Sequence, residues 1–237
     1  MVKVLPALAT ALLAGCVDCG GAPQTGVFGQ LTAGPGAIFL EEGPVQQGEF
    51  KRFGVIGEDG RFRVSLPSAG TWGVHLYVEG YFYLPLQLEV REDFFTRIEQ
   101  PAIDWSIVRN GPSWGSSGEQ PVDPRILAAI PDDDPSDNPV LTNPTVQMIA
   151  AGRFEASVEV LDPNGDLSRQ VLLGQEETGD GVQFNTPQGL PVIEDNYPNG
   201  TYTVTRMPEE VADPHGAWYF VAADHLCSNS PILRVVP

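Results

Sequence analysis

Positive charge is scarce in this sequence of 237 residues. Lys and Arg together number 13 against 31 Asp and Glu, and the formal net charge at pH 7 is −18. Such a chain cannot neutralise a run of phosphates, so nucleic acid is excluded as a partner. Only Lys3 and Lys51 are lysines, and a lysine patch for anionic lipid is therefore absent as well.

Apolar runs long enough to cross a bilayer are also missing from the start of the chain. Val4–Gly15 is uncharged, but its 12 residues would span only about 18 Å as a helix, less than the ~30 Å hydrocarbon core. Because the run follows the short basic start Met1-Val2-Lys3, it is typical of a secretory signal peptide.

The end of this run, Leu13-Ala14-Gly15-Cys16, resembles the lipobox of bacterial lipoproteins. The resemblance implies that residues 1–15 are removed as a signal peptide and that Cys16 carries a diacylglyceryl thioether and an acylated amine. Two or more lipid chains give stable anchoring. Val17 follows Cys16 where family members retained at the inner membrane tend to have Asp, so outer-membrane localisation is favoured. The alternative is an ordinary signal peptide with a coincidental cysteine.

Cysteine is rare, with three residues in the chain. Once Cys16 is lipidated, Cys19 and Cys227 are the only thiols left, and in an oxidising compartment they permit one disulfide. The alternative is that Cys227 is a small buried apolar residue and Cys19 is exposed.

Glycine and proline, 26 and 22 residues, favour short strands over long helices. Strict alternation, as in Arg61-Phe62-Arg63-Val64-Ser65-Leu66, predicts strands with one buried face. We expect an all-β fold of two β-sandwich domains, since the length suits two domains of about 100 residues. The expected boundaries are a tether at 16–25, a first sandwich at 26–104, a Pro-rich acidic linker at 105–143 and a second sandwich at 144–237.

Five short motifs in the first sandwich resemble, in order, the carboxypeptidase regulatory-like family, whose fold is transthyretin-like. The motifs are Phe28-Gly29-Gln30, Gly36-Ala37-Ile38-Phe39-Leu40, Glu58-Asp59-Gly60-Arg61-Phe62, Leu66-Pro67-Ser68-Ala69-Gly70-Thr71-Trp72 and Glu79-Gly80-Tyr81. The resemblance implies a non-catalytic accessory module and carries no catalytic residues. The second sandwich, with many short strands and closely spaced turns, is expected to be immunoglobulin-like.

One short helix is expected inside the linker. Asp123 suits the N-cap, Pro124 suits the first helical position, and Pro131 would end the helix after Ile130. The acidic run 132–137 that follows is expected to be a solvated spacer.

No strong catalytic motif is present, and we expect no enzyme activity. Gly111-Pro112-Ser113-Trp114-Gly115 matches G-x-S-x-G, but a nucleophile elbow needs a strand before it and a helix after it. His75 falls on the polar side of a predicted strand. The other residues of the kinds that bind transition metals lie near the C-terminus. They form no HExxH or paired CxxC motif, so they are expected to be ordinary loop or core residues. They are Asp213, His215, Asp224, His225 and Cys227.

A calcium loop is one interpretation of the turn at Asp162, Asn164 and Asp166. With Ser168 these residues place oxygen atoms at the first, third, fifth and seventh positions. The turn is not an EF-hand, because glycine stands at the fourth position and the glutamate at the twelfth is missing, so Glu194-Asp195-Asn196 would add oxygens from another loop. The other interpretation is a plain Pro-Asn-Gly hairpin turn.

Aromatic residues crowd one strand of the first sandwich and the turn after it: Trp72, Tyr77, Tyr81, Phe82 and Tyr83. The three tyrosines share one side, opposite Trp72. An exposed aromatic strip would stack on sugars or bind a partner, whereas a covered one would pack across strands.

The sequence therefore predicts a lipid-anchored protein of the cell envelope, at the outer membrane, with a non-catalytic binding or structural role. Two alternatives stay open: calcium-dependent adhesion to a glycan or protein, and an accessory subunit of an envelope complex. The ligand itself is not predicted.

Overall fold

The computed structural model describes residues 24–99, 125–132, 134–150, 153–176, 178–206, 216–225 and 228–236. The predicted signal peptide, Cys16, Cys19, Cys227, the G-x-S-x-G motif, Asp213 and His215 lie outside the described residues. Among the described residues the only helical element is a 3-10 turn, η3, at Pro135–Asp137, and no helix is long and apolar enough to cross a bilayer. The all-β prediction is thus confirmed.

Fourteen strands make up the described chain. The first half contains β1 (Gly26–Gln30), β2 (Gly36–Glu42), β3 (Glu49–Ile56), β4 (Arg61–Ser65), β5 (Gly70–Val78), β6 (Leu84–Val90) and β7 (Phe95–Arg97). The second half contains β8 (Val140–Ala150), β9 (Arg153–Leu161), β10 (Leu167–Gln175), β11 (Asp180–Gln183), β12 (Gly200–Arg206), β13 (Trp218–Asp224) and β14 (Leu233–Val235).

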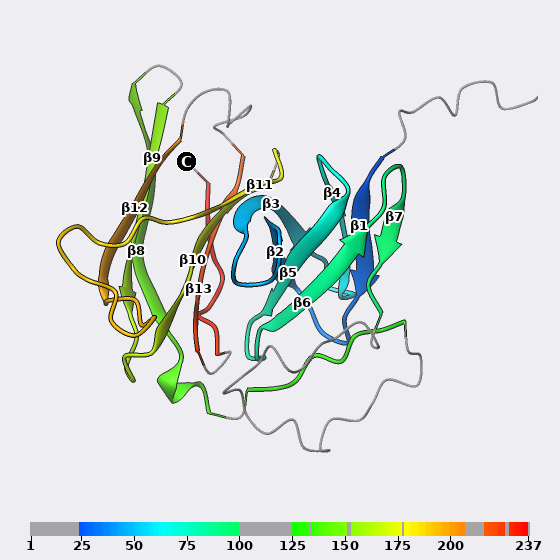
Figure 1. Ribbon diagram of the computed structural model, residues 1–237. Coiled ribbons are helices and arrows are strands. Elements are labelled where there is room, and N and C mark those ends of the chain that lie inside the picture. Colours follow the sequence, from blue (N-terminus) through cyan, green and yellow to red (C-terminus); the bar gives the residue numbers. More distant parts are fainter. Residues whose placement is uncertain are drawn as a thin grey trace, which may run out of the picture.

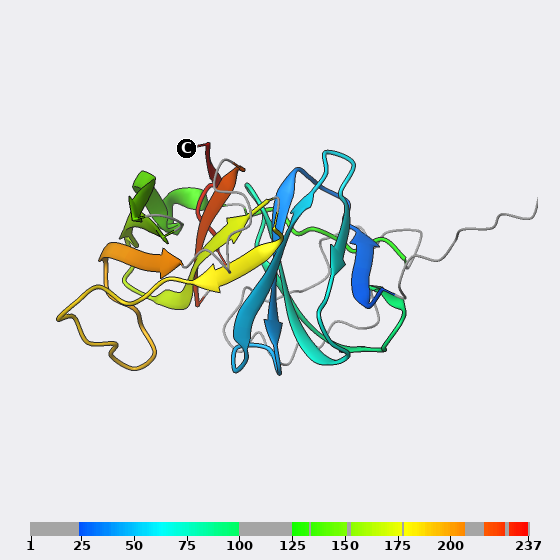
Figure 2. The ribbon, with the colours of Figure 1, turned by 90° about the horizontal axis from the view of Figure 1, so that it is seen from above.

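The strands form three sheets. Two are three-stranded, in the orders β4-β1-β7 and β12-β9-β8, and lie at opposite ends of the molecule (Figure 1). The third has eight strands in the order β14-β13-β10-β11-β3-β2-β5-β6, and it runs from one half of the chain into the other. The view from above shows β11 reaching across to β3 (Figure 2). Their ladder consists of one pair, Asp180 with Arg52.

Each half packs a hydrophobic cluster between two layers of sheet. In the first half the alternation predicted for β4 is confirmed, since Phe62 and Val64 are buried while Arg61 and Arg63 are exposed. Trp72 belongs to the same cluster and is fully buried. The corresponding cluster in the second half contains Trp218, Phe220 and Tyr202. The identification of the halves as transthyretin-like and immunoglobulin-like stays a prediction.

A third hydrophobic cluster joins the two halves. It packs aromatic residues from the far face of β2, β3 and β5 against the far face of β10 and β13. Its buried members are Ala37, Phe39, Phe50, Phe53, Tyr77, Tyr83, Leu172, Ala217, Tyr219, Val221 and Ala223. The interpretation of Tyr77 and Tyr83 as an exposed strip is therefore wrong, because the second half covers them.

The segment that follows residue 124 also departs from the expectation. The predicted helix is wrong for residues 125–130, which have no helical residue. Leu127 instead forms a parallel bridge with Leu31 and is fully buried in the first cluster. Farther along, β8 begins at Val140, inside the stretch expected to be linker.

Candidate functional site

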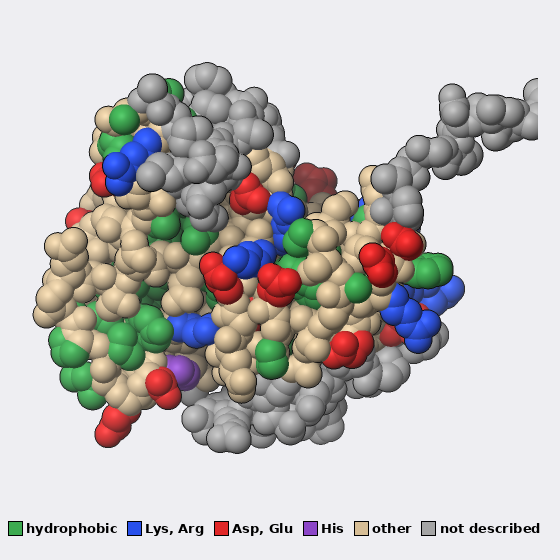
Figure 3. All heavy atoms as spheres, turned by 45° about the horizontal axis from the view of Figure 1, so that its top comes forward, with side chains coloured by type: hydrophobic (Ala, Val, Ile, Leu, Met, Phe, Trp, Pro, Cys, Tyr) green, Lys and Arg blue, Asp and Glu red, His purple; other side chains and the backbone are tan. Residues whose placement is uncertain are grey.

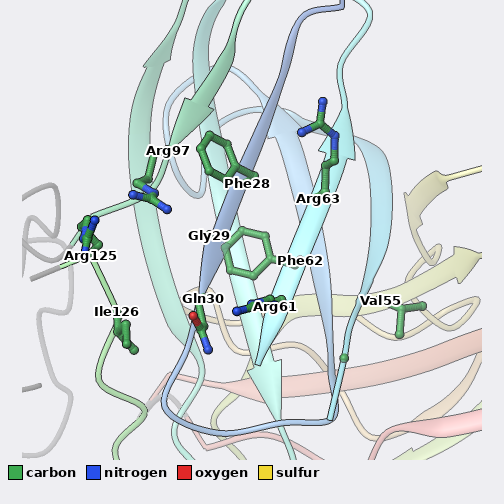
Figure 4. Close-up of a pocket in the computed structure, with 11 residues that line it drawn as sticks. Phe28, Gly29, Gln30, Val55, Arg61, Phe62, Arg63, Arg97, Arg125 and Ile126 are labelled. Atoms are coloured by element: carbon green, nitrogen blue, oxygen red, sulfur yellow. The ribbon is translucent and has the colours of Figure 1, made fainter. Parts of the chain in front are cut away.

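The outward side of the sheet β4-β1-β7 carries a row of arginine and aromatic side chains. β1 is the central strand, and Phe28 pairs with Arg63 on β4 and with Arg97 on β7. Side chains of directly paired residues lie on the same side of a sheet, so Phe28 is flanked by one arginine on each side, as Figure 4 shows.

A second row lies next to the first along β1. Gln30 pairs with Arg61 on β4. On the other side of β1, the amide of Leu127 donates to the carbonyl of Gln30 over 2.8 Å, and this bond brings Arg125 and Ile126 to the edge of the sheet. We call this surface the arginine face: Phe28, Gln30, Arg61, Arg63, Phe95 and Arg97, with Arg125 at its edge. All of these residues except Phe95 line a hollow of about 730 Å³.

Two cation–π contacts hold the guanidinium groups in place. The Cζ atom of Arg97 lies 5.2 Å from the centre of the Phe28 ring, and that of Arg63 lies 3.3 Å from the centre of the Phe95 ring. Phe95 reaches its position because Gly26 has no side chain: a Cβ there would lie 2.4 Å from Cε1 of Phe95. Stacking fixes the plane of each guanidinium and leaves its N–H groups available at the edges.

The charge of the arginine face is opposite to that of the protein. It holds four of the 13 basic residues of a chain whose net charge is −18. Arg61 is partly neutralised by Asp59, with 3.5 Å between Nε and Oδ2. Within the described part of the chain, Arg63 and Arg97 form no ion pair. Planar cations that lack a protein partner bind carboxylate, sulfate or phosphate groups.

The sequence indicated only part of this face. Alternation placed Arg61 and Arg63 outward, but β7 is three residues long and has no recognisable pattern, so Arg97 was not placed beside Phe28. The contribution of Arg125 depends on the bridge between Leu31 and Leu127, which joins residues far apart in the chain.

The calcium candidates lie elsewhere, in the turn between β9 and β10. Asp162 is buried, Asn164 is exposed and Asp166 is partly buried. Across the described ranges, no group of three or more His, Cys, Asp or Glu side chains is arranged to hold a metal ion. Asp224 is buried at the end of β13, and the ring Nε2 of His225 is hydrogen-bonded to the carbonyl of Asp195 at 3.0 Å.

His75 does not lie on a polar surface, contrary to the expectation. It is fully buried, and its Nε2 lies 2.8 Å from Oε1 of Glu41, which is fully buried too. Arg169 on β10 reaches the other carboxylate oxygen of Glu41. Because Glu41 and His75 belong to the first half and Arg169 to the second, this buried cluster connects the halves.

No known protein family and no curated protein matches this chain. Among solved structures, one similar chain is a candidate carbohydrate-binding protein from Bacteroides uniformis ATCC 8492, with 13% identity, a TM-score of 0.29, and coverage of 90% of this chain and 98% of that chain. Another is the major pilin subunit of Bacillus cereus, with 10% identity, a TM-score of 0.23, and coverage of 90% and 69%. Both TM-scores are too low to assign a fold family or a function.

Proposed function

We propose that this chain is a non-catalytic binding protein that holds an acidic saccharide on the arginine face. The observation that carries the proposal is the row Arg63–Phe28–Arg97, in which two arginines flank an aromatic ring and neither has an ion-pair partner among the described residues. Among its described residues the face has cations to bind anionic groups but no nucleophile beside a base, so the chemistry that we propose for it is that of binding.

The ligand class follows from three properties of the face. Stacked guanidinium groups bind carboxylate or sulfate in a bidentate manner. Phe28 is partly exposed and offers an apolar surface for the C–H side of a sugar ring. The side-chain nitrogen of Gln30 donates to the carbonyl of Asp59 at 3.0 Å, and its side-chain oxygen can accept a hydrogen bond from a hydroxyl group. The rest of the protein is acidic and repels a dense polyanion. A saccharide whose charges are spaced along the chain satisfies all three.

The proposal includes anchoring through Cys16 at the outer membrane. β1 begins ten residues after Cys16. A fully extended chain of ten residues spans roughly 33 Å. The arginine face is built on β1 and its two neighbours, so a lipid at Cys16 would hold this face within that distance of the bilayer surface. The anchored protein would therefore display its binding face close to the envelope.

A panel of acidic and neutral oligosaccharides tests the binding proposal, with affinity measured by calorimetry. We expect carboxylated or sulfated saccharides to bind and their neutral counterparts not to bind. The double variant Arg63→Gln/Arg97→Gln should bind about 10- to 100-fold more weakly, because it removes charged hydrogen bonds. The control Arg153→Gln/Arg234→Gln removes the same charge from the second half and should bind normally.

Three results would overturn the proposal. They are equal binding of neutral and acidic saccharides, equal weakening by both double variants, and binding of vesicles with anionic lipid without binding of any saccharide. Raising the salt from about 0.05 to 0.5 M should weaken the binding of the unmodified protein, since exposed charges are screened.

The anchor has a separate test. Replacing Cys16 with Ala removes the only thiol that the lipobox-like motif can modify, so the protein should leave the membrane fraction or stay unprocessed. A Cys16→Ala protein that is processed and still fully membrane-bound would contradict lipidation.

A further inference from the structure

The turn between β9 and β10 places two carboxylates close together with little to neutralise them. Asp162 follows the last residue of β9 and Asp166 precedes the first residue of β10. Gly165 takes a left-handed conformation, φ 79°, and lets the chain reverse over the five residues, 162–166, between the two strands. Between the two carboxylates, the side-chain oxygen of Asn164 lies 3.4 Å from the amide nitrogen of Asp166.

Asp162 is buried without a partner for its carboxylate. The residue is 2% exposed, and neither of its carboxylate oxygens has a hydrogen bond. The buried Oδ1 atom of Asp166 also lacks one. An ionised carboxylate removed from water is strongly destabilising unless a cation or donors face it. Among the described side chains, no cation pairs with either carboxylate.

The backbone keeps Asp162 in this position. The side chain of Asn199 accepts a hydrogen bond from the amide of Asp162 at 2.7 Å and donates to its carbonyl at 3.1 Å. This pair of hydrogen bonds to Asn199 fixes the end of β9, so the carboxylate of Asp162 cannot reach solvent by a shift of the main chain.

Burial and the negative charge of Asp166 raise the pKa of Asp162 to about 6. The backbone amides of Asn164, Asp166 and Leu167 lie near enough to lower this pKa in part, although none completes a hydrogen bond. The electrostatic environment of the carboxylate thus agrees with its unpartnered geometry.

Two other segments are hydrogen-bonded to the end of the turn. The amide of Tyr197 donates to the carbonyl of Leu167 at 2.8 Å, and the amide of His225 donates to the carbonyl of Asp166 at 3.1 Å. Nε2 of His225 is hydrogen-bonded to the Asp195 carbonyl at 3.0 Å, and the side chains of Asp162, Asn164 and Asp166 offer oxygen atoms to a cation. Oxygen-only sets suit hard cations, and Ca²⁺ accepts irregular geometry more readily than Mg²⁺ does.

We propose that Asp162, Asn164 and Asp166 bind one Ca²⁺ ion. Two carboxylates are a small number for this ion, so the affinity should fall in the range of extracellular modules, about 0.1–1 mM. The site belongs to the second half of the chain and is separate from the arginine face. Its failure would leave the proposed saccharide binding untouched.

Thermal unfolding of the full-length protein, first in EDTA and then in excess Ca²⁺ or Mg²⁺, tests the site. At tenfold the dissociation constant, Ca²⁺ should raise the melting temperature by about 3–6 °C, and Mg²⁺ should raise it less. Calorimetry should give one ion per chain. Asp162→Asn should lose the rise in Ca²⁺ yet match or exceed the unmodified protein in EDTA, because it removes an unpartnered buried charge.

Asp137→Asn is the matched control, since Asp137 is an exposed aspartate in η3, and it should keep the full response to Ca²⁺. Asp166→Asn provides a second variant in case Asp162→Asn does not fold. No heat and no rise at 10 mM Ca²⁺ would overturn the proposal, as would a rise that persists in both turn variants.

Discussion

At the scale of single residues, Glu41 holds three segments of the chain together. Its carboxylate accepts hydrogen bonds from the amides of Gln46 and Gly48 and contacts the side chains of His75 and Arg169. Each carboxylate oxygen has two of these four contacts, so a glutamine, which keeps one oxygen and has an NH₂ group in place of the other, would lose the acceptor for two of them. The carboxylate is therefore expected to be essential for stability, although it takes no part in the arginine face.

Glu41→Gln should lower the free energy of unfolding by about 3–5 kcal/mol, as expected when one member of a buried charged cluster is removed. Chemical denaturation measures the change. The neighbouring Glu42→Gln is the control: Glu42 is exposed and bonds Ser68 at 3.0 Å, so its loss should stay below about 0.5 kcal/mol. Equal effects of the two substitutions would disprove the role given to Glu41.

Asp162 predicts a pH dependence of stability in the absence of calcium. Its pKa in the folded protein is about 6, while that of an unfolded aspartate is near 3.9. Between about pH 4 and pH 6 the folded state binds more protons, so stability is highest below the unfolded pKa and falls as the pH rises through this window. The loss should reach roughly 2–3 kcal/mol.

Other groups titrate in the same range, so the measured quantity is the difference between the unmodified protein and Asp162→Asn, both in EDTA. That difference should favour the variant increasingly from pH 4 to pH 7. A difference that does not change with pH would contradict the burial of an ionisable Asp162.

At the scale of strands, the contact between β3 and β10 depends on a glycine. A Cβ on Gly174 would lie 2.1 Å from Cδ2 of Phe53, whose ring packs directly over the β10 backbone. Gly174→Ala should therefore separate these strands and lower stability by about 1–3 kcal/mol or more. Thr201→Ala, at an exposed position of β12, should change stability by less than about 0.5 kcal/mol.

Strands with one buried face could be predicted from the sequence, and those without a pattern could not. β4 and β9 alternate strictly, because one side of each strand packs in a cluster and the other meets solvent. β8 is an edge strand with mostly exposed side chains, and Pro144 lies within it. Its 11 residues therefore show no regular alternation of apolar and polar side chains. For this reason part of the strand was assigned to the linker. The helix expected at 123–130 was predicted from the capping residues Asp123 and Pro124. Residues 125–130 are not helical, because Leu127 forms a strand-like bridge with Leu31 instead.

The candidate site shows the same division. The residues of the proposed calcium site are close in sequence and were chosen from their spacing, whereas the arginine face joins residues from 28 to 125 through strand pairing. The burial of His75 and Tyr77 could not be predicted either. Both lie on the side of β5 that the second half covers. The local sequence pattern does not indicate that a distant segment will bury this side.

At the scale of the whole molecule, the two halves should remain associated after the chain between them is cut. The shared cluster buries aromatic residues of both halves, and Arg52 pairs with Asp180 across them at 2.9 Å. If a specific protease site is placed between Gly111 and Gly118, the two fragments should elute together in native size-exclusion chromatography. They should separate in about 6 M urea. Separate elution under native conditions would show that the halves are independent domains.

The third hydrophobic cluster, which the two halves share, is completed late in the synthesis of the chain. The chain is made from its N-terminus, and the strands of the first half end with β7 at Arg97. Ala223, the last buried member of the cluster, is added 126 residues later, which takes roughly 6–25 s at usual rates of translation. During that interval Phe39, Phe53 and Tyr77 have nothing to cover them, so the nascent chain presents a chaperone with an aromatic surface that the finished protein no longer shows.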